Sequence, residues 1–367
     1  MEFIELAELC DKGSSNLAQK DLVFDSGIYP VYGAPGEITK VDFFHQSKPY
    51  LGLIKDGAGV GRVMQLPANS SVIGTIQYIF PKENVDLKYL YYLIKYLDLG
   101  KSNTGATIPH IYFKDYKKRK VKVREYGEQK HIGQILELID SHLSAYKNVL
   151  EQYDLLIKSR FVEIFGNPII NDKNYPVFKL KDISQKIGSG FTPRGGDSNY
   201  IEKGIAFIRS MNIYNNTFKN DNLAYIDEFL ANQLSTVELF PKDLLLNITG
   251  ASVARCCTVP DEILPARVNQ HVCIIRQHRI SNIFLEHCLT NESYQEYLLL
   301  LSNKNGATRE ALTKTQVENL DVIFPPLVEI TKFVKLVEQI NKLKSDVQKS
   351  IDETQLLMDS LMQEYFG

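Results

Sequence analysis

The sequence predicts an α+β protein in which two globular parts of mixed α/β content are each followed by one long helix. Three observations lead to this fold class. The C-terminal part of the chain repeats an internal segment, both copies of that segment carry a helical pattern of apolar residues, and a second pair of related motifs lies upstream of the copies. The chain therefore reads as an internal duplication of one globular part plus one helix.

The repeat is visible in the endings "FVEIFG" at 161–166 and "MQEYFG" at 362–367. Residues 105–166 align with residues 306–367 at a constant shift of 201 without a gap, and 14 of the 62 positions are identical. Both copies begin with "GAT" and end with "FG". Identity alone is weak support, so the hydrophobic pattern is the stronger test.

Apolar residues in both copies alternate at steps of four and three, which is the spacing of a helix packed along another helix. Nearly forty residues without proline are long for an ordinary core helix, so we expect a helix pair, each helix spanning roughly 50 to 55 Å. The second copy keeps the pattern with two polar exceptions. The first seam is Ile132, Leu136, Ile139, Leu143, Tyr146, Leu150, Tyr153 and Ile157, and the second is Phe333, Val337, Ile340, Lys344, Val347, Ile351, Thr354 and Met358.

Composition bounds the class of protein. The chain has 367 residues, of which 44% are hydrophobic and 23% charged, typical of a globular protein with two or three domains. No basic leader or long apolar run is present, so we expect a cytoplasmic protein without a membrane partner. Five cysteines without a CxxC pair favour a reducing compartment, and the spacing of Cys256, Cys257, His271 and Cys273 matches no common zinc pattern, so no metal site is expected.

Charge is distributed unevenly, although the net charge is only −2. Residues 1–127 carry 17 Lys and Arg against 14 acids, and residues 167–327 carry 16 against 17. The two helical stretches carry the remaining 9 basic and 13 acidic residues. A protein that reads nucleic acid through two local faces joined by acidic rods would show this balance, and so would an ordinary soluble protein.

Related turns follow two strand-like runs, "PYLGLIK" at 49–55 and "DLLLNIT" at 243–249. The turns are "GAGVGR" at 57–62 and "GASVAR" at 250–255. A dinucleotide-binding loop is disfavoured because the second copy has Ser and Ala where such a loop needs glycine. Both copies keep one Gly and one Arg, so we predict a tight turn that presents a guanidinium to a guanine edge or a phosphate.

Other loops differ between the two parts, which suggests two different specificities. The first part has "YPVYGAPGEITK" at 29–40 and a basic run, "KDYKKRKVKVR" at 114–124, that is either a phosphate contact or a solvated strand edge. The second part has "GSGFTPRGGDSNY" at 188–200 and "FIRSMNIYNN" at 207–216. Since no GxxxxGK[ST], HExxH or GxSxG motif occurs in the sequence, we expect no catalysis by this chain.

This arrangement resembles the DNA-specificity subunit of type I restriction-modification systems over the whole chain. The family segment leading into each helix is similar to Pro-Pro-Leu-x-Glu-Gln. Here "PPLVE" at 325–329 fits until Ile330, while "REYGEQ" at 124–129 keeps the Glu and Gln but lacks the prolines. "GATIPH" at 105–110 and "YPVYGAPG" at 29–36 are also typical, whereas "GATREA" at 306–311 departs after its third residue.

The resemblance implies a pseudo-two-fold molecule with two target-recognition domains, at 1–127 and 167–327, each reading half of a split DNA sequence. A central spacer helix at 128–166 and a C-terminal spacer helix at 328–367 would lie antiparallel as a coiled coil. Half-sites on one face of B-DNA lie about one helical turn apart, near 34 to 36 Å, and helices of the expected length can hold two domains at such a separation.

The resemblance also assigns chemistry to partners. It implies two modification subunits that bind S-adenosylmethionine, and restriction subunits that use ATP and Mg, with no cofactor on this chain. Apolar positions beside the seam, such as Leu138 and Phe165, could be buried by a partner helix.

The residues predicted to contact double-stranded DNA are polar or basic side chains in turn-rich stretches or beside the repeat motifs. The rival interpretation is a coiled-coil scaffold whose globular ends bind proteins, and a third is a DNA reader without working partner subunits. The DNA-contact candidates are Tyr32, Lys55, Arg62 and His110 in the first domain, and Thr192, Arg194, Arg209, Asn212, Arg255 and Arg309 in the second.

Overall fold

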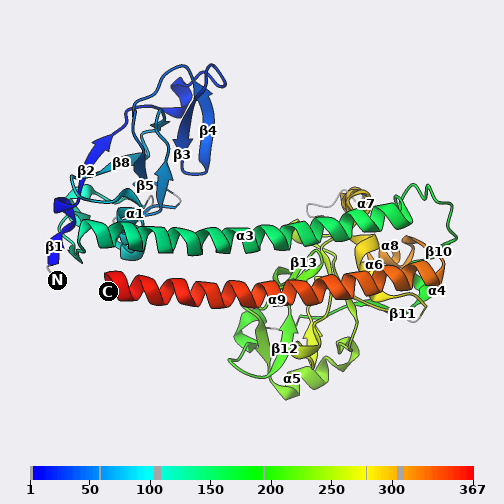
Figure 1. Ribbon diagram of the computed structural model, residues 1–367. Coiled ribbons are helices and arrows are strands. Elements are labelled where there is room, and N and C mark those ends of the chain that lie inside the picture. Colours follow the sequence, from blue (N-terminus) through cyan, green and yellow to red (C-terminus); the bar gives the residue numbers. More distant parts are fainter. Residues whose placement is uncertain (1–2, 58, 103–108, 193–194, 278, 304–309) are drawn as a thin grey trace. The chain divides into compact units, whose positions relative to one another are not determined.

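The computed structural model describes residues 3–57, 59–102, 109–192, 195–277, 279–303 and 310–367 (Figure 1). The chain divides into two compact units. Unit 1 contains residues 1–149 and 347–367, and unit 2 contains residues 150–346. Each long helix therefore begins in one unit and ends in the other, and each unit is described separately below.

Unit 1 is built on three small sheets. The largest has the strand order β2-β8-β5-β6 with antiparallel pairing throughout, the second has the order β4-β3-β7, and β1 pairs with β9. All five side chains of β5 are buried, which explains why its sequence is a continuous apolar run. The strands are β1 Phe3–Glu5, β2 Cys10–Ser14, β3 Tyr29–Gly33, β4 Gly36–Val41, β5 Tyr50–Ile54, β6 Val63–Leu66, β7 Ser71–Val72, β8 Ile76–Pro81 and β9 Lys120–Lys122.

Unit 2 repeats the three sheets of unit 1 and adds a two-stranded hairpin, β13–β14. Its largest sheet has the order β11-β19-β16-β17, its second sheet has the order β15-β12-β18, and β10 pairs with β20. In both second sheets the outer pairs are one antiparallel and one parallel. The predicted internal repeat and the α+β class are therefore confirmed. The strands are β10 Val177–Lys179, β11 Ser184–Ser189, β12 Ile205–Ile208, β13 Ile213–Tyr214, β14 Thr217–Phe218, β15 Ala224–Ile226, β16 Leu244–Asn247, β17 Cys256–Thr258, β18 Ala266–Val268, β19 Val272–Gln277 and β20 Asp321–Ile323.

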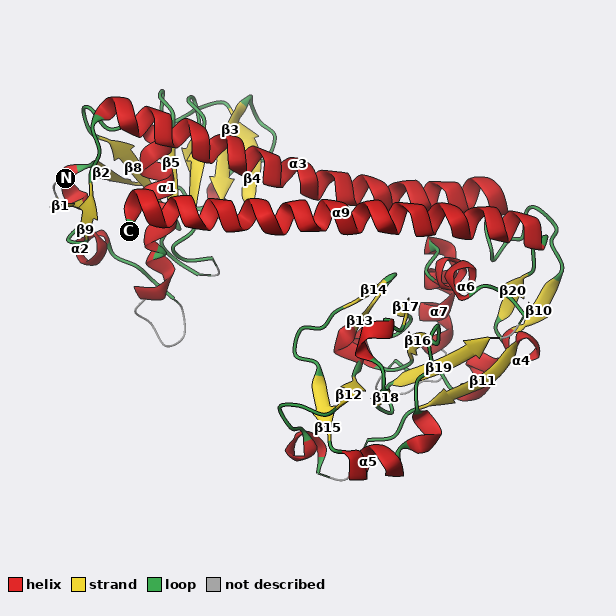
Figure 2. Ribbon diagram, turned by 60° about the horizontal axis from the view of Figure 1, so that its bottom comes forward, coloured by secondary structure: helices red, strands yellow, loops and turns green. Residues whose placement is uncertain are grey.

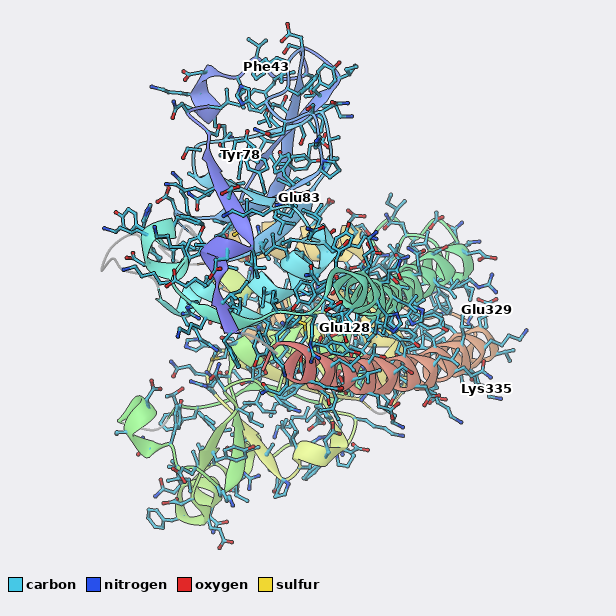
Figure 3. All side chains as sticks on the ribbon, turned by 60° about the vertical axis from the view of Figure 1, so that its left-hand side comes forward. Phe43, Tyr78, Glu83, Glu128, Glu329 and Lys335 are labelled. Atoms are coloured by element: carbon cyan, nitrogen blue, oxygen red, sulfur yellow. The ribbon has the colours of Figure 1, made fainter. Side chains whose placement is uncertain are left out.

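Short helices occupy related places in the two repeats. α1 follows β8 as α6 and α7 follow β19, and α2 precedes β9 as α8 precedes β20. The second sheet of unit 1, β4-β3-β7, forms the end of that unit far from α3. Figure 3 shows Phe43 at this end, with Tyr78 between Phe43 and Glu128 of α3. The helices are α1 Leu87–Leu97, α2 Phe113–Tyr116, α3 Tyr126–Phe165, α4 Leu180–Ile183, α5 Glu228–Gln233, α6 Asn282–Leu289, α7 Glu292–Asn303, α8 Lys314–Glu318 and α9 Leu327–Phe366.

The two long helices, α3 and α9, have 40 residues each and run in opposite directions within each unit (Figure 2). Ten of the fourteen predicted apolar seam positions are buried, while Tyr146, Leu150, Tyr153 and Val347 are half-buried. The predicted pair of long helices is therefore confirmed. The buried positions are Ile132, Leu136, Ile139, Leu143, Ile157, Phe333, Val337, Ile340, Ile351 and Met358.

Four phenylalanines join the helices to the core of unit 2. Phe161 and Phe165 of α3 contact Phe333 of α9 at centroid distances of 5.5 and 5.4 Å, and Phe165 contacts Phe284 of α6 at 4.9 Å. Phe165 is fully buried, so its prediction as an apolar position for a partner helix was wrong. The last turn of α3 lies inside the core of unit 2, where residues of α4, α6 and α7 belong to the same buried cluster. Leu138 is 58% exposed and stays available.

In unit 1, α3 packs closely on α1 because residue 133 is glycine. A Cβ at Gly133 would lie 3.0 Å from the Lys88 side chain and 3.1 Å from the Tyr89 amide nitrogen. Gln129 is buried beside this contact and accepts from the Asp86 amide (3.0 Å) while donating to the Arg124 carbonyl (2.8 Å). This polar link accounts for the Gln of the family-like segment before the helix.

The equivalent of Gln129 in unit 2 is Ile330, which is buried in an apolar core instead. The end of α9 completes unit 1: Phe366 lies 5.2 Å from Tyr89, and the Tyr96 hydroxyl donates to Gln363 (2.8 Å). Both units therefore include parts of both long helices in their cores.

Replacing Phe333 with alanine is expected to lower the free energy of unfolding of unit 2 by about 3 to 5 kcal/mol, because it leaves a cavity among the other three phenylalanines. Denaturant unfolding followed by hydrogen exchange in unit 2 measures the loss. Phe229→Ala is the matched control, since Phe229 is 73% exposed. Equal stability of the two variants would contradict the role given to this aromatic cluster.

Candidate DNA interface

The two repeats share one tight turn at the end of a buried strand. In unit 1 the Ile54 amide donates to the Arg62 carbonyl (2.9 Å), and in unit 2 the Asn247 amide donates to the Arg255 carbonyl (2.8 Å). Strands β5 and β16 end just before these turns. The structure confirms the predicted turns, with an arginine at the same place in each.

Each turn is also tied to the segment that follows the GAT run. The Gly57 amide donates to the Pro109 carbonyl (3.1 Å), and the Gly250 amide donates to the Glu310 carbonyl (2.9 Å). The φ angles of +83° at Gly57 and +72° at Gly250 lie in the region that glycine adopts without steric cost. The GAT runs themselves, at 105–107 and 306–308, lie outside the described residues.

In unit 1 the turn gathers three of the predicted DNA-contact residues. Lys55 lies 3.9 Å from Asp56, and Asp56 contacts His110 through its carboxylate. Arg62 is exposed and its guanidinium donates to the Ala34 carbonyl in the β3–β4 turn. The three predicted residues thus lie around one loop edge.

Tyr32 lies in β3 and is partly buried against the apolar cluster that contains Tyr50 and Tyr78. Burial and the nearby Glu37 raise the pKa of Tyr32 above its ordinary value. Its hydroxyl therefore stays protonated at neutral pH and can donate or accept. Part of its role is packing in the small sheet of unit 1.

In unit 2, Arg209 and Asn212 follow β12 and belong to one loop. Asn212 is fully buried: its amide oxygen accepts from the Arg209 main-chain amide (3.1 Å), and its nitrogen donates to the carbonyls of Lys219 (3.0 Å) and Asp221 (3.2 Å). The Arg209 guanidinium lies 5.2 Å from the centre of the Tyr200 ring. Asn212 thus holds the loop that presents Arg209, and we assign it a positioning role.

Arg255 meets two residues that the sequence did not single out. Its guanidinium carbon lies 4.6 Å from the centroid of the Tyr214 ring, and the Lys219 ammonium lies 4.3 Å from the same centroid. Tyr214 and Lys219 flank the Asn-Asn turn of the β13–β14 hairpin. The aromatic and basic residues on either side of that turn were the signal available in the sequence.

Other arginines of unit 2 are structural. Arg267 is buried and pairs with Glu238 (3.3 Å), and Arg276 makes two contacts with Asp243, at 2.8 and 2.7 Å. Thr192 is half-buried in the loop after β11. Two further candidates, Arg194 and Arg309, lie outside the described residues.

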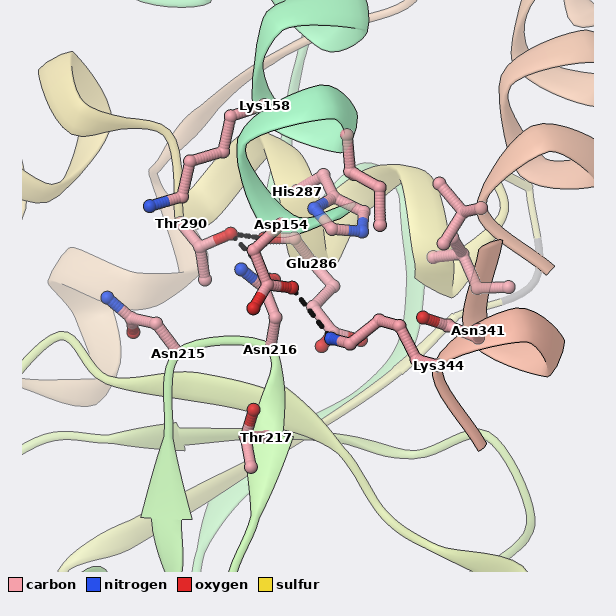
Figure 4. A pocket seen from close by; sticks show the side chains of 13 residues that line it. Asp154, Lys158, Asn215, Asn216, Thr217, Glu286, His287, Thr290, Asn341 and Lys344 are labelled. Carbon is pink, nitrogen blue, oxygen red and sulfur yellow. Dashed lines mark hydrogen bonds and ion pairs between the residues drawn. The ribbon is translucent and has the colours of Figure 1, made fainter. Parts of the chain in front are cut away.

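A polar cavity of about 170 Å³ lies behind the β13–β14 hairpin in unit 2 (Figure 4). The Thr290 hydroxyl donates to Asn216 of the hairpin turn (2.9 Å), and Asp154 of α3 pairs with Lys344 of α9 (2.6 Å). Glu286 also lines the cavity. The Thr290–Asn216 bond ties the hairpin to the end of α6, and the Asp154–Lys344 pair joins the two long helices beside the same cavity.

Two titratable groups of this cavity are strongly shifted. Burial raises the pKa of Glu286 from 4.5 to about 7, against two hydrogen bonds from Thr258 that lower it. Burial lowers the pKa of His287 from 6.5 to about 4. His287 is therefore neutral at pH 7, while Glu286 is close to its midpoint.

Cysteines do not form a metal site in the described part of the chain, where no group of three or more His, Cys, Asp or Glu could hold a metal ion. All five cysteines are buried as free thiols. Burial raises the pKa of the Cys273 thiol to about 12, so it is inert at neutral pH. No described helix is both long enough and apolar enough to span a membrane.

Duplicated α+β units on long helices, each with an arginine on a shared turn, define a two-domain recognition protein. The family model described as the type I restriction modification DNA specificity domain matches residues 1–152 and 172–354, and the chain belongs to this family. It is a specificity subunit of a type I restriction-modification system, which targets the complex and does not catalyse.

Relatives agree with this assignment. The MjaIX specificity subunit of Methanocaldococcus jannaschii is 24% identical over 306 residues, covering 77% of this chain and 69% of that protein. The S subunit of a type I system from M. genitalium has a TM-score of 0.66 at 15% identity, covering 100% of this chain and 96% of that one. A chain from a type I restriction-modification structure on complex assembly and conformational transition has a TM-score of 0.53 at 13% identity, covering 99% and 97%.

Glu286→Gln is expected to become more stable relative to the parent protein as pH rises from about 4.5 to above 7. The neutral carboxyl is favoured in the folded state, so the parent loses this stabilisation as pH rises through the folded pKa, by up to about 3 kcal/mol. Denaturant unfolding at several pH values measures the difference. Glu296→Gln on α7 is the control, because Glu296 is exposed and its variant should show no such trend.

Proposed function

We propose that each unit binds one half of a bipartite double-stranded DNA sequence through the face that carries its shared turn. The supporting observation is that the same turn, with an arginine at the same position, recurs beside otherwise different loops in both units. Arg is the side chain best suited to bidentate contact with guanine or phosphate. Recognition would be assigned to residues 1–127 and 167–327.

Specific residues have different expected roles. In the first domain Lys55, Arg62 and His110 cluster at the turn, with Tyr32 in the adjoining sheet. In the second domain Arg209 and Arg255 are held against tyrosine rings. Thr192 remains a candidate on its loop. Arg194, two residues further along the sequence, and Arg309, which follows the second GAT run, also remain candidates.

The long helices would set the spacing of the half-sites. Their proposed limits are residues 128–166 and 328–367, close to the 40-residue spans of α3 and α9. Each helix contributes buried residues to both units. A change in helix length would therefore change the distance between the two units. This makes the helix pair the natural determinant of the gap between half-sites.

Docking of the modification subunits is proposed on the outer faces of the helices. In unit 2 a groove of about 600 Å³ lies between α3 and α7 and includes Leu155, Val162 and Leu299. Leu155 is 55% exposed and Val162 is 49% exposed. An amphipathic helix of a partner would bury these side chains.

Chemistry would belong to the partners. We assign S-adenosylmethionine to two modification subunits, and ATP and Mg to the restriction subunits, with no cofactor on this chain. The function of this chain is then to position those enzymes on DNA.

The deciding experiment is co-expression of this chain with the modification subunit of its own genome in a methylation-free host, followed by mapping of methylated adenines. A two-part motif with a fixed gap is the expected result. An intact complex without new methylation would leave a protein-binding scaffold, or a DNA reader without active partners, as the accounts that remain.

Arg62→Gln is expected to affect one half of the motif only. If Arg62 contacts a base, the variant loses about 1 to 3 kcal/mol of discrimination at one position of that half. The readout is the same methylation map, with Lys130→Gln on α3 of unit 1 as a matched loss of positive charge. Unchanged methylation at every position would remove Arg62 from the interface.

Leu155→Asp is expected to reduce co-purification of the modification subunit by at least tenfold, because a carboxylate would be buried without a partner. Phe229→Asp introduces the same change at another exposed apolar site of unit 2. Thermal unfolding of both variants should match the parent protein. Full retention of the complex by Leu155→Asp would place docking elsewhere.

A further inference from the structure

A cationic cluster lies at the end of the β13–β14 hairpin in unit 2. Lys219 and Arg255 come from different loops, yet both charged groups lie within 4.6 Å of the centroid of the Tyr214 ring. The three residues are separated in sequence but share one place in the fold because Tyr214 pairs with Thr217 in the hairpin, and β14 leads directly to Lys219.

Neither cation has an acidic partner within the part of the chain that the structure describes. Among the ion pairs of the described residues in unit 2, none includes Lys219 or Arg255, whereas the neighbouring Arg267 and Arg276 each meet a carboxylate. Because both charged groups lie on one ring, at 4.3 and 4.6 Å from its centroid, they are at most 8.9 Å apart, and an anion that reaches both is attracted by both. Contact with the face of the tyrosine ring favours both cations at this place.

An open hollow of about 570 Å³ adjoins the cluster and is lined by Tyr214 and Arg255. Its other polar lining includes Ser252 and the pair Thr249–His271, whose side chains lie 2.6 Å apart. Glu310 contributes a carboxylate to the lining, which disfavours an anion beside it. Arg255 is the cation of this lining, so an anion in the hollow would be held there, with Lys219 on the same Tyr214 ring.

We infer that Lys219 and Arg255 bind phosphate oxygens of the DNA backbone, and that Tyr214 is a positioning residue that holds both cations. This inference rests on the proposed DNA binding and goes further by assigning Arg255 to phosphate contact. The Lys219 ammonium is a compact point charge, which suits a phosphate oxygen. A base edge, in contrast, is read by a planar group such as a single guanidinium. The two charges and the hydroxyl-lined hollow match a phosphodiester.

Phosphate contacts have a signature that base contacts lack. Removal of one phosphate contact weakens binding to all sequences equally. It also reduces the slope of log affinity against log salt concentration by about 0.9. The test uses the full chain in complex with its modification subunits. Two duplexes serve as probes: one carries the mapped methylation motif, and the other is a shuffled sequence of equal length.

Arg255→Gln and Lys219→Gln should each weaken binding to both duplexes by the same factor, about tenfold at moderate salt, and lower the salt slope by about 0.9. Tyr214→Leu should lose affinity similarly, while Tyr214→Phe should retain it, because the ring and not the hydroxyl holds the cations. Lys173→Gln is the matched control, since Lys173 is exposed between α3 and β10. Thermal unfolding of every variant checks that unit 2 is folded.

Several outcomes would overturn the inference. Loss confined to the motif duplex, with an unchanged salt slope, would make Arg255 a base reader and leave the proposed function intact. Unchanged binding by both glutamine variants would remove the cluster from the interface. Failure of the parent complex to bind either duplex at low salt would instead refute the proposed function itself.

Discussion

Neither long helix can bury its apolar stripe alone, and this constraint shapes the rest of the structure. In unit 2, Phe161 and Phe165 of α3 are covered only when Phe333 of α9 and Phe284 of α6 pack against them. In unit 1 the end of α9 closes over α1 through Phe366. Because the cores include both helices, the globular parts are not independent modules added to a rod.

In unit 2 the shared turn reaches this core, because Val253 and Ala254 belong to the same buried cluster as the four phenylalanines. The turn at the end of β5 or β16 is fixed by main-chain hydrogen bonds and by positive φ angles, at Gly57, Gly59 and Gly61 in unit 1 and at Gly250 and Ala254 in unit 2. The backbone of the turn therefore does not depend on the side chains that it presents. An arginine can be offered at the same place in two repeats whose neighbouring loops have diverged.

Sequence periodicity predicted the long helices well because the apolar seam repeats over about forty residues. Most positions of the seam are buried, so each repeat of the pattern supports the same prediction. Local polarity was a poorer guide to side-chain roles. Asn212 sits in a loop and looks exposed from its sequence, yet its amide is consumed by three main-chain partners. The meeting of Lys219 and Arg255 on Tyr214 could not be predicted, because it depends on how β14 and β17 approach in three dimensions.

Differences at equivalent positions show how two specificities can share one scaffold. Asp56 and Thr249 occupy the same place in the two turns, and each makes the same isolated bridge to the segment after the GAT run. Their side-chain partners nevertheless differ: Asp56 contacts His110, whereas Thr249 contacts His271, the residue just before β19. A carboxylate in one unit and a hydroxyl in the other change the hydrogen-bonding character of the face while the main chain stays the same. Since the fold tolerates this exchange, the side chains at these turn positions can change without disturbing the helix seam on which both cores depend.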